Sequence, residues 1–272
     1  RGELVSSRQH LDRALALDRR EYHDIYLSMA NENWGISARR LHCISLWSLG
    51  YADQALALAR EAVTLAEQIG HPFSLGGAHF AVGVTCVLQR DWPASQLQFE
   101  KVFAIAEEYS LGTYLNRSKI FHAMARFFQE PGREAIDEIR QGIESLRFRG
   151  EILGMTGNLA RLAESLWVIG RCEEGLDAIA EAMDVAESAE ERFWEAELWR
   201  VKGELLLKAD DDNAQIEAEN CYHKAIEIAL RQNAKSWELR AVRSLARLWQ
   251  RQGKRAEARQ MLAEIYGWFT EG

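Results

Sequence analysis

The sequence predicts an all-α fold built from stacked pairs of helices. The first observation is a period, because short turn signals recur about every forty residues along the chain, and such a period is the signature of a helical repeat. The second is composition: the 272 residues include only 3 prolines, and proline breaks helices. The third is that residues of matched size recur at the same spacing. Together they favour a solenoid, in which each repeat packs only on its neighbours.

The turn signals divide each repeat into a first and a second helix. They lie at 50–53, 90–91, 130–131, 170–171, 210–213 and 253. We expect first helices at 34–49, 73–90, 113–129, 151–169, 191–209 and 234–252, and second helices at 52–69, 93–109, 132–148, 172–188, 214–232 and 254–266. The stretch 2–19 has the pattern of a second helix without its partner, followed by a connection at 20–33. The prediction is one solenoid over 1–272, with a partial repeat and connection at 1–33 and six helix pairs at 34–272.

Equivalent positions of the repeats carry residues of similar size. The second helices place a small residue four positions before a larger one, as in Ser95 and Phe99. Alternation of small and large side chains lets neighbouring helices interdigitate, so these positions are expected in the core. The first helices have a small residue where close crossing of two helices requires one, at Cys43, Gly83, Ala123, Ala163, Gly203 and Ala246.

Bulk properties exclude several classes of protein. A net charge of −8 argues against general nucleic-acid binding, which needs a basic surface. The stretch 73–89 has no Asp, Glu, Lys or Arg but falls short of the ~20 residues that span a bilayer, so we expect a buried helix and no membrane. Four widely spaced cysteines are typical of reduced thiols, and we expect a cytoplasmic protein. Because the chain begins with Arg1, we expect a fragment of a longer protein.

The sequence has no motif of nucleotide or metal chemistry. It lacks a Gly-rich phosphate loop ending in Lys-Ser/Thr and a His-Glu-x-x-His pair. His42 and His122 share a repeat position and His79 lies near it; a metal site is one interpretation, and partly buried histidines without a metal are the preferred one. Carboxylate pairs fall near helix ends, without sign of the cleft that acid–base catalysis needs. We expect no cofactor, no metal and no enzymatic activity.

Several sequence phrases resemble a known group of repeats. The size pattern is similar to the tetratricopeptide repeat, lengthened from its usual ~34 residues, and the phrases resemble the C-terminal repeat region of large bacterial signalling proteins. Those proteins join an adenylate/guanylate cyclase or kinase-like domain to a predicted ATPase module and then to the repeats. The resemblance implies a right-handed superhelix of tetratricopeptide-like helix pairs, with the cyclase and ATPase chemistry upstream and absent here. The phrases are Leu46-Trp47 before Leu49-Gly50-Tyr51, His71-Pro72-Phe73-Ser74-Leu75, Glu195-Ala196-Glu197-Leu198 leading to Lys202-Gly203-Glu204-Leu205, and Gln252-Gly253-Lys254-Arg255-Ala256-Glu257-Ala258.

The same resemblance implies that the first helices line a concave groove. Aromatic and arginine side chains dominate binding hot spots, so such a groove suits an extended peptide or a helix. Core packing is the competing interpretation for the tryptophans. The side chains expected to project into the groove are Arg40, Trp47, Phe80, Arg117, Met124, Phe128, Glu164, Trp167, Arg200, Glu204, Arg240, Arg243 and Arg247.

The last expected helix pair is locally basic. Arg240, Arg243, Arg247 and Arg251 fall at helical spacing on one face. One interpretation is a solvated end of the solenoid, and the other is a docking patch for an acidic partner or for the upstream domains.

The sequence favours a non-enzymatic interaction module that regulates or targets a larger signalling protein and binds a protein or peptide segment in its groove. The chain's own upstream domains are among the candidate partners, and a homodimer through uncapped repeat ends is another. The alternative is a repeat domain that senses a small-molecule effector of an ATP-dependent regulator, since repeats in the maltose-regulon activator resemble this layout and bind an oligosaccharide.

Overall fold

A computed structural model describes residues 2–209 and 212–271, and within these ranges all regular structure is helical. The all-α prediction is therefore confirmed. Asp210 and Asp211, from the expected acidic turn, lie outside the described residues, as do the terminal Arg1 and Gly272. Contacts divide the chain into two compact units, one of residues 4–145 and one that joins the residues from Leu146 onward with those before Leu4. The extent of the predicted single domain stays a prediction, and each unit is described by itself.

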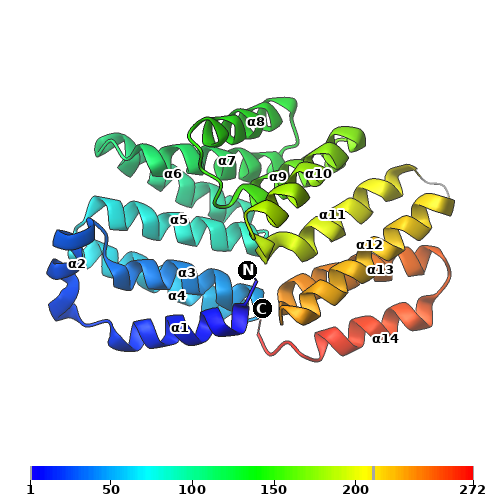
Figure 1. Ribbon diagram of the computed structural model, residues 1–272, viewed down its shortest axis with the longest axis horizontal. Helices are drawn as coiled ribbons and strands as arrows, with labels where there is room; N and C mark the ends of the chain where they lie inside the picture. Colours follow the sequence, from blue (N-terminus) through cyan, green and yellow to red (C-terminus); the bar gives the residue numbers. More distant parts are fainter. Residues whose placement is uncertain (1, 210–211, 272) are drawn as a thin grey trace. The chain divides into compact units, whose positions relative to one another are not determined.

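The N-terminal unit consists of helices that follow one another as neighbours, as Figure 1 shows in blue to green. Helix α1 packs against α3, and from α3 to α7 each helix packs against the next. The first helices α3, α5 and α7 also contact one another in order. The bounds are α1 (Leu4–Leu17), a 3₁₀ turn (Arg20–Tyr22), α2 (His23–Ala30), α3 (Trp34–Ser48), α4 (Ala52–Ile69), α5 (Pro72–Gln89), α6 (Trp92–Glu108), α7 (Gly112–Gln129) and α8 (Arg133–Phe148), which crosses the unit boundary.

The C-terminal unit repeats this arrangement. From α9 to α14 each helix packs against the next, and α11 also contacts both other first helices, α9 and α13. The bounds are α9 (Met155–Val168), α10 (Cys172–Ser188), a 3₁₀ turn η2 (Arg192–Trp194), α11 (Glu195–Leu206), a 3₁₀ turn η3 (Leu207–Ala209), α12 (Asp212–Arg231), α13 (Lys235–Arg251) and α14 (Arg255–Tyr266).

The recurring turns share one backbone device. Gly50, Gly170 and Gly253 have φ values of 99°, 77° and 83°, the left-handed conformation that ends many helices. At the first of these turns, the Tyr51 N–H donates to the Leu46 carbonyl at 2.9 Å. Such a bond closes a helix end by satisfying a carbonyl that the helix leaves unpaired. Equivalent bonds run from Asp91 to Cys86, from Arg171 to Leu166 and from Lys254 to Trp249, each at 2.9 Å.

The small residues of the first helices make room for large side chains of the second helices. A Cβ added at Gly83 would stand 2.7 Å from the ring of Phe99, and one added at Gly203 would stand 2.6 Å from the ring of Tyr222. Both rings are fully buried. The matched sizes that predicted the repeat are thus the contacts that hold each helix pair together.

Ten of the twelve expected repeat helices have both ends within two residues of the prediction. The two exceptions are α9, which begins only at Met155 after Gly154 adopts a φ of 84°, and the range 191–209, which divides into η2, α11 and η3. The sequence analysis also missed α2 inside the expected connection at 20–33.

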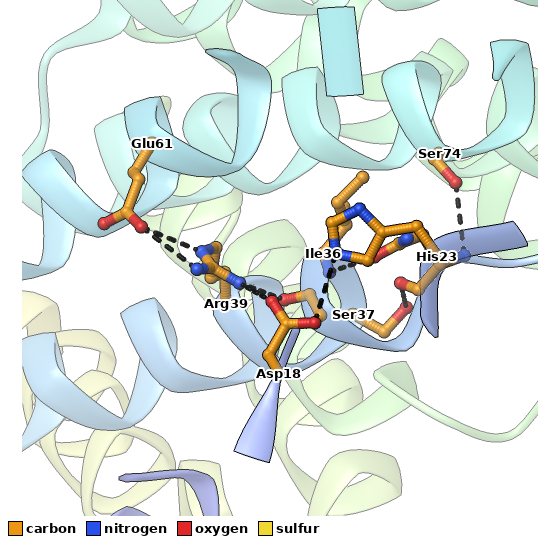
Figure 2. A network of polar contacts seen from close by, with 9 residues as sticks. Asp18, His23, Ile36, Ser37, Arg39, Glu61 and Ser74 are labelled. Carbon is orange, nitrogen blue, oxygen red and sulfur yellow. Dashed lines mark hydrogen bonds and ion pairs between the residues drawn. The ribbon is translucent and has the colours of Figure 1, made fainter. Parts of the chain in front are cut away.

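A polar network ties the N-terminal connection to the stack (Figure 2). Figure 2 shows Arg39 of α3 between the carboxylates of Asp18 and Glu61, at 2.8 and 3.1 Å. Asp18 also lies 3.3 Å from Nε2 of His23 at the start of α2. Gly35 lets this carboxylate approach, because a Cβ there would stand 2.2 Å from Asp18 Oδ2. One buried aspartate therefore joins the end of α1, the start of α2 and the middle of α3.

The uncharged stretch 73–89 forms most of α5, whose residues are nearly all buried. Helices α3, α4, α6 and α7 all contact it. Among the described helices, none has the length and apolar character that crossing a bilayer requires. The predicted buried helix is confirmed.

Candidate functional site

Three charged side chains of α11 share one face, because Glu197, Arg200 and Glu204 are spaced three and four residues apart and such spacings coincide on a helix. The repeat period brings partners from the adjacent first helices. Glu164 of α9 lies forty residues before Glu204, and Ser244 of α13 lies forty residues after it. Neighbouring first helices therefore present these groups to each other.

Arg200 is the centre of this cluster. Its guanidinium lies 2.8 Å from Glu197, 3.0 Å from Glu164 and 3.4 Å from Glu204. Its side chain is 7% exposed, and the three carboxylates are equally protected. Burial alone would lower the pKa of Arg200, but the charges of Glu197 and Glu164 raise that pKa well above its ordinary value, so the guanidinium stays charged.

Helix α13 completes the network. Arg240 donates to Glu197 at 3.0 Å, and the Ser244 hydroxyl donates to Glu204 at 2.6 Å. We call the set Glu164, Glu197, Arg200, Glu204, Arg240 and Ser244 the Arg200 network.

The network includes three residues of the predicted groove. Glu164, Arg200 and Glu204 were expected to meet a partner, but the structure buries them and directs them at one another. The forty-residue period explains the difference, because it aligns opposite charges on neighbouring first helices. These three residues hold α9, α11 and α13 together, and they carry little free surface for recognition.

A cavity of about 250 Å³ lies beside the network, within the C-terminal unit. We call it the α9–α13 cavity, because α9, α11 and α13 all contribute to its wall. It combines apolar surface with charged and hydroxyl groups. Its lining residues are Trp167, Glu204, Leu207, Lys208, Tyr222, Ser244, Arg247, Leu248 and Arg251.

The electrostatics of the α9–α13 cavity are cationic. Lys208, Arg247 and Arg251 line it against the single carboxylate of Glu204, which the Arg200 network already engages. Arg247 and Arg251 are exposed, and across residues 2–209 and 212–271 neither forms an ion pair. Lys208 lies over the ring of the half-buried Trp167, with 5.6 Å from Nζ to the ring centroid. The wall therefore offers positive charge next to an aromatic surface.

Three of the residues predicted for the groove line this cavity, namely Trp167, Glu204 and Arg247. Their role as binding residues stays a prediction. Arg243 is exposed but does not line the cavity, and Arg240 is half-buried over the ring of Trp237.

The N-terminal unit places its predicted residues differently. Trp47 is 4% exposed and Met124 is fully buried, so both are core residues. Arg40 is half-buried, pairs with Glu32 at 2.9 Å and lies over the ring of Tyr114. Trp47 and Met124 therefore have little surface to offer a partner, and their predicted groove role stays a prediction.

Phe80, Arg117 and Phe128 are half-buried in the same unit. Phe128 stacks on Trp92 with 4.4 Å between ring centroids, and Phe80 meets Phe121 edge to face at 5.5 Å. All three are partly exposed, and their predicted role in the groove stays a prediction.

Sequence reasoning missed Tyr222 and Lys208 as members of a candidate site. Tyr222 belongs to a second helix, α12, and its ring reaches the cavity only because Gly203 has no side chain. The matched sizes contained a signal for Tyr222, because it is the large residue of its second helix and carries a hydroxyl group. Lys208 lies in η3, which the sequence analysis treated as helix.

The histidines that share a repeat position have different surroundings. Within the described ranges, no group of three or more His, Cys, Asp or Glu side chains is placed to hold a metal ion. His42 lies 2.8 Å from Asp12, and His79 donates from Nδ1 to Gln98 at 2.8 Å. Burial lowers the pKa of His79 and that of His122.

The sequence itself has few informative relatives. No protein-family model matches it. An uncharacterized protein of Rhizobium meliloti (strain 1021) is 22% identical over 206 residues, which cover 75% of this chain and 20% of that protein. The chain thus matches about a fifth of that relative's length.

Solved structures are more informative. A Rap protein complexed with Competence and Sporulation Factor matches over 97% of this chain and 76% of its own, with a TM-score of 0.70 and 14% identity. NprR in complex with its cognate peptide NprX matches over 94% of this chain and 76% of its own, with a TM-score of 0.63 and 17% identity. The fold is shared with Rap and NprR. Apo RapI also matches, with a TM-score of 0.57 and 14% identity over 97% of this chain and 92% of that one.

These similarities confirm the tetratricopeptide-like helical repeat fold. The association with a cyclase or an ATPase stays a prediction.

Proposed function

We propose that this chain is a regulatory binding module that takes a peptide segment against the first helices of its C-terminal unit. The observation that carries the proposal is the α9–α13 cavity, where a half-buried tryptophan meets two arginines that form no ion pair within residues 2–209 and 212–271. Cavities with apolar surface and a few convergent polar groups are the usual binding sites of proteins. The fold neighbours support the proposal, since NprR was solved with its cognate peptide and Rap with Competence and Sporulation Factor.

We further propose that the module acts within a longer signalling chain and is itself without catalytic activity. The length of the Rhizobium relative, of which this chain matches only a fifth, supports a multidomain context. A cytoplasmic location agrees with the free state of Cys43, Cys86, Cys172 and Cys221.

The α9–α13 cavity does not favour a sensor of an oligosaccharide or similar effector. Its volume of about 250 Å³ is below the ~300–1,000 Å³ typical of sites that enclose a small ligand. It suits one residue of a longer chain.

Selection from a random peptide display library tests the proposal. We expect enriched peptides that bind the wild-type chain and lose at least about tenfold in affinity on a variant with Arg247→Glu and Arg251→Glu, because the reversal places like charges in the wall. The matched control is Arg255→Glu with Arg259→Glu, two exposed arginines of α14 outside the cavity. No enrichment, or equal loss in both variants, would contradict the proposed site.

A further inference from the structure

We propose that the α9–α13 cavity binds a carboxylate and that the free C-terminus of the bound peptide supplies it; this inference rests on the proposed function. Three properties of the wall carry it: surplus positive charge, a hydroxyl group without a partner, and an apolar side large enough for one side chain.

The surplus charge comes from Arg247, Arg251 and Lys208. The only carboxylate in the wall among the described residues, that of Glu204, is engaged by Arg200 and Ser244, so three cations line the cavity against one carboxylate. A guanidinium presents N–H donors in a fork that matches the two oxygens of a carboxylate. An anion with two oxygens is therefore the ligand that complements the cavity.

The hydroxyl belongs to Tyr222. It is buried, and the part of the chain that the structure describes offers it no hydrogen-bond partner, although buried hydroxyls are normally paired. Burial and then the charge of Glu204 raise the pKa of Tyr222, so the group remains a protonated donor at neutral pH. Tyr222 lines the cavity, so an anion bound there can supply the acceptor that this O–H lacks among the described residues.

The apolar side consists of Trp167, Leu207 and Leu248. A peptide C-terminus places its carboxylate next to its last side chain. One residue can therefore contact the cationic side of the cavity with its carboxylate and the apolar side with its side chain. The position of Arg251 has another explanation, because it lies in the last turn of α13 and a positive charge near a helix C-terminus is stabilised by the helix dipole. It does not explain the unpaired hydroxyl of Tyr222.

The test compares two pools of N-acetylated random hexapeptides without Asp or Glu, identical except that one ends in a free acid and the other in an amide. Each pool is passed over the immobilised wild-type chain, and retained peptides are quantified by mass spectrometry. We expect the acid pool to be retained about tenfold more strongly than the amide pool. That preference should disappear in a variant with Arg247→Met and Arg251→Met but persist in Arg255→Met with Arg259→Met.

The Tyr222→Phe variant separates recognition from folding. Removing an unpaired buried hydroxyl should leave the melting temperature unchanged or higher, while retention of the acid pool falls about tenfold, the effect of one hydrogen bond to a charged group. Unchanged retention of the acid pool by Tyr222→Phe would remove this residue from the proposal.

The outcomes distinguish the two proposals. Equal retention of acid and amide pools overturns the carboxylate site and leaves peptide binding intact. Retention of neither pool contradicts the proposed function itself. Full displacement of the acid pool by 10 mM acetate, about the level expected for a simple anion site, would show that a free carboxylate fills the cavity and would overturn the peptide end as its source.

Discussion

Replacing Arg200 by methionine tests whether the Arg200 network holds the first helices of the C-terminal unit together. Methionine keeps much of the length and apolar surface of the arginine side chain but removes its charge and its four hydrogen bonds to Glu164, Glu197 and Glu204. Three carboxylates that are about nine-tenths buried then face one another. Removing one partner of a buried ion pair costs ~3–5 kcal/mol.

Two remaining groups reduce this cost. Arg240 still donates to Glu197, and Ser244 still donates to Glu204. We therefore expect the lower end of the range, about 3 kcal/mol in the free energy of unfolding, which corresponds to roughly 10 °C in melting temperature for a unit of this size.

The pH dependence makes the prediction specific. Without the guanidinium, the crowded carboxylates have folded-state pKa values above their unfolded values, so the folded variant takes up protons first as the pH falls. The gap between the wild type and Arg200→Met should narrow between pH 7 and pH 5. Urea denaturation followed by circular dichroism measures the gap at each pH.

The matched control is Arg243→Met on α13, an exposed arginine outside the network. It should change the free energy of unfolding by less than ~0.5 kcal/mol. A loss below ~1 kcal/mol for Arg200→Met, or a gap that does not depend on pH, would refute the reasoning that uncompensated buried charge is the cause.

Three further predictions concern other parts of the chain. Burial lowers the pKa of His79, so its contribution to stability is present above its unfolded pKa of ~6.5 and is lost as the pH falls; a thermal melt series should show a shallower acid loss for His79→Gln, and an equal slope would contradict this. Native alkylation with iodoacetamide should modify the half-buried Cys172 well before Cys43, because burial raises the pKa of the Cys43 thiol to about 11; simultaneous labelling in peptide maps would count against it. Asp18→Ala should lower the free energy of unfolding by about 2 kcal/mol, as expected for a buried charged hydrogen bond, and should speed amide hydrogen exchange in α2. Exchange as slow as in the wild type would show that Arg39 does not need Asp18 as a partner.

The fold was predictable because it depends on local and periodic signals. Gly50 and Gly170 mark helix ends that the structure closes with the same backbone bond, and Gly83 and Gly203 mark close helix crossings. Such signals act within one repeat, so sequence spacing captures them. Helix α2 was not predicted because it occurs once and has no counterpart in the other repeats.

Side-chain exposure was less predictable. A repeat position assigns a residue to a face of its helix, but two neighbouring helices decide whether that face is covered. Trp47 and Met124 satisfied the pattern expected of the groove and are buried. Trp167 occupies the same repeat position as Trp47 and is only half-buried. The difference in exposure between Trp47 and Trp167 depends on how closely the neighbouring helices cover each residue, and the period alone does not determine that.

The candidate site arises where the repeat departs from its own regularity. Helix α11 has 12 residues, against 17 in α13, and continues as the 3₁₀ turn η3. Leu207 and Lys208 of that turn form part of the cavity wall. A regular repeat covers its surface with equivalent contacts, so recognition requires a position at which those contacts are interrupted. We infer that the proposed binding at Arg247 and Arg251 depends on this irregularity, because the 3₁₀ turn that ends α11 supplies two residues of the cavity wall.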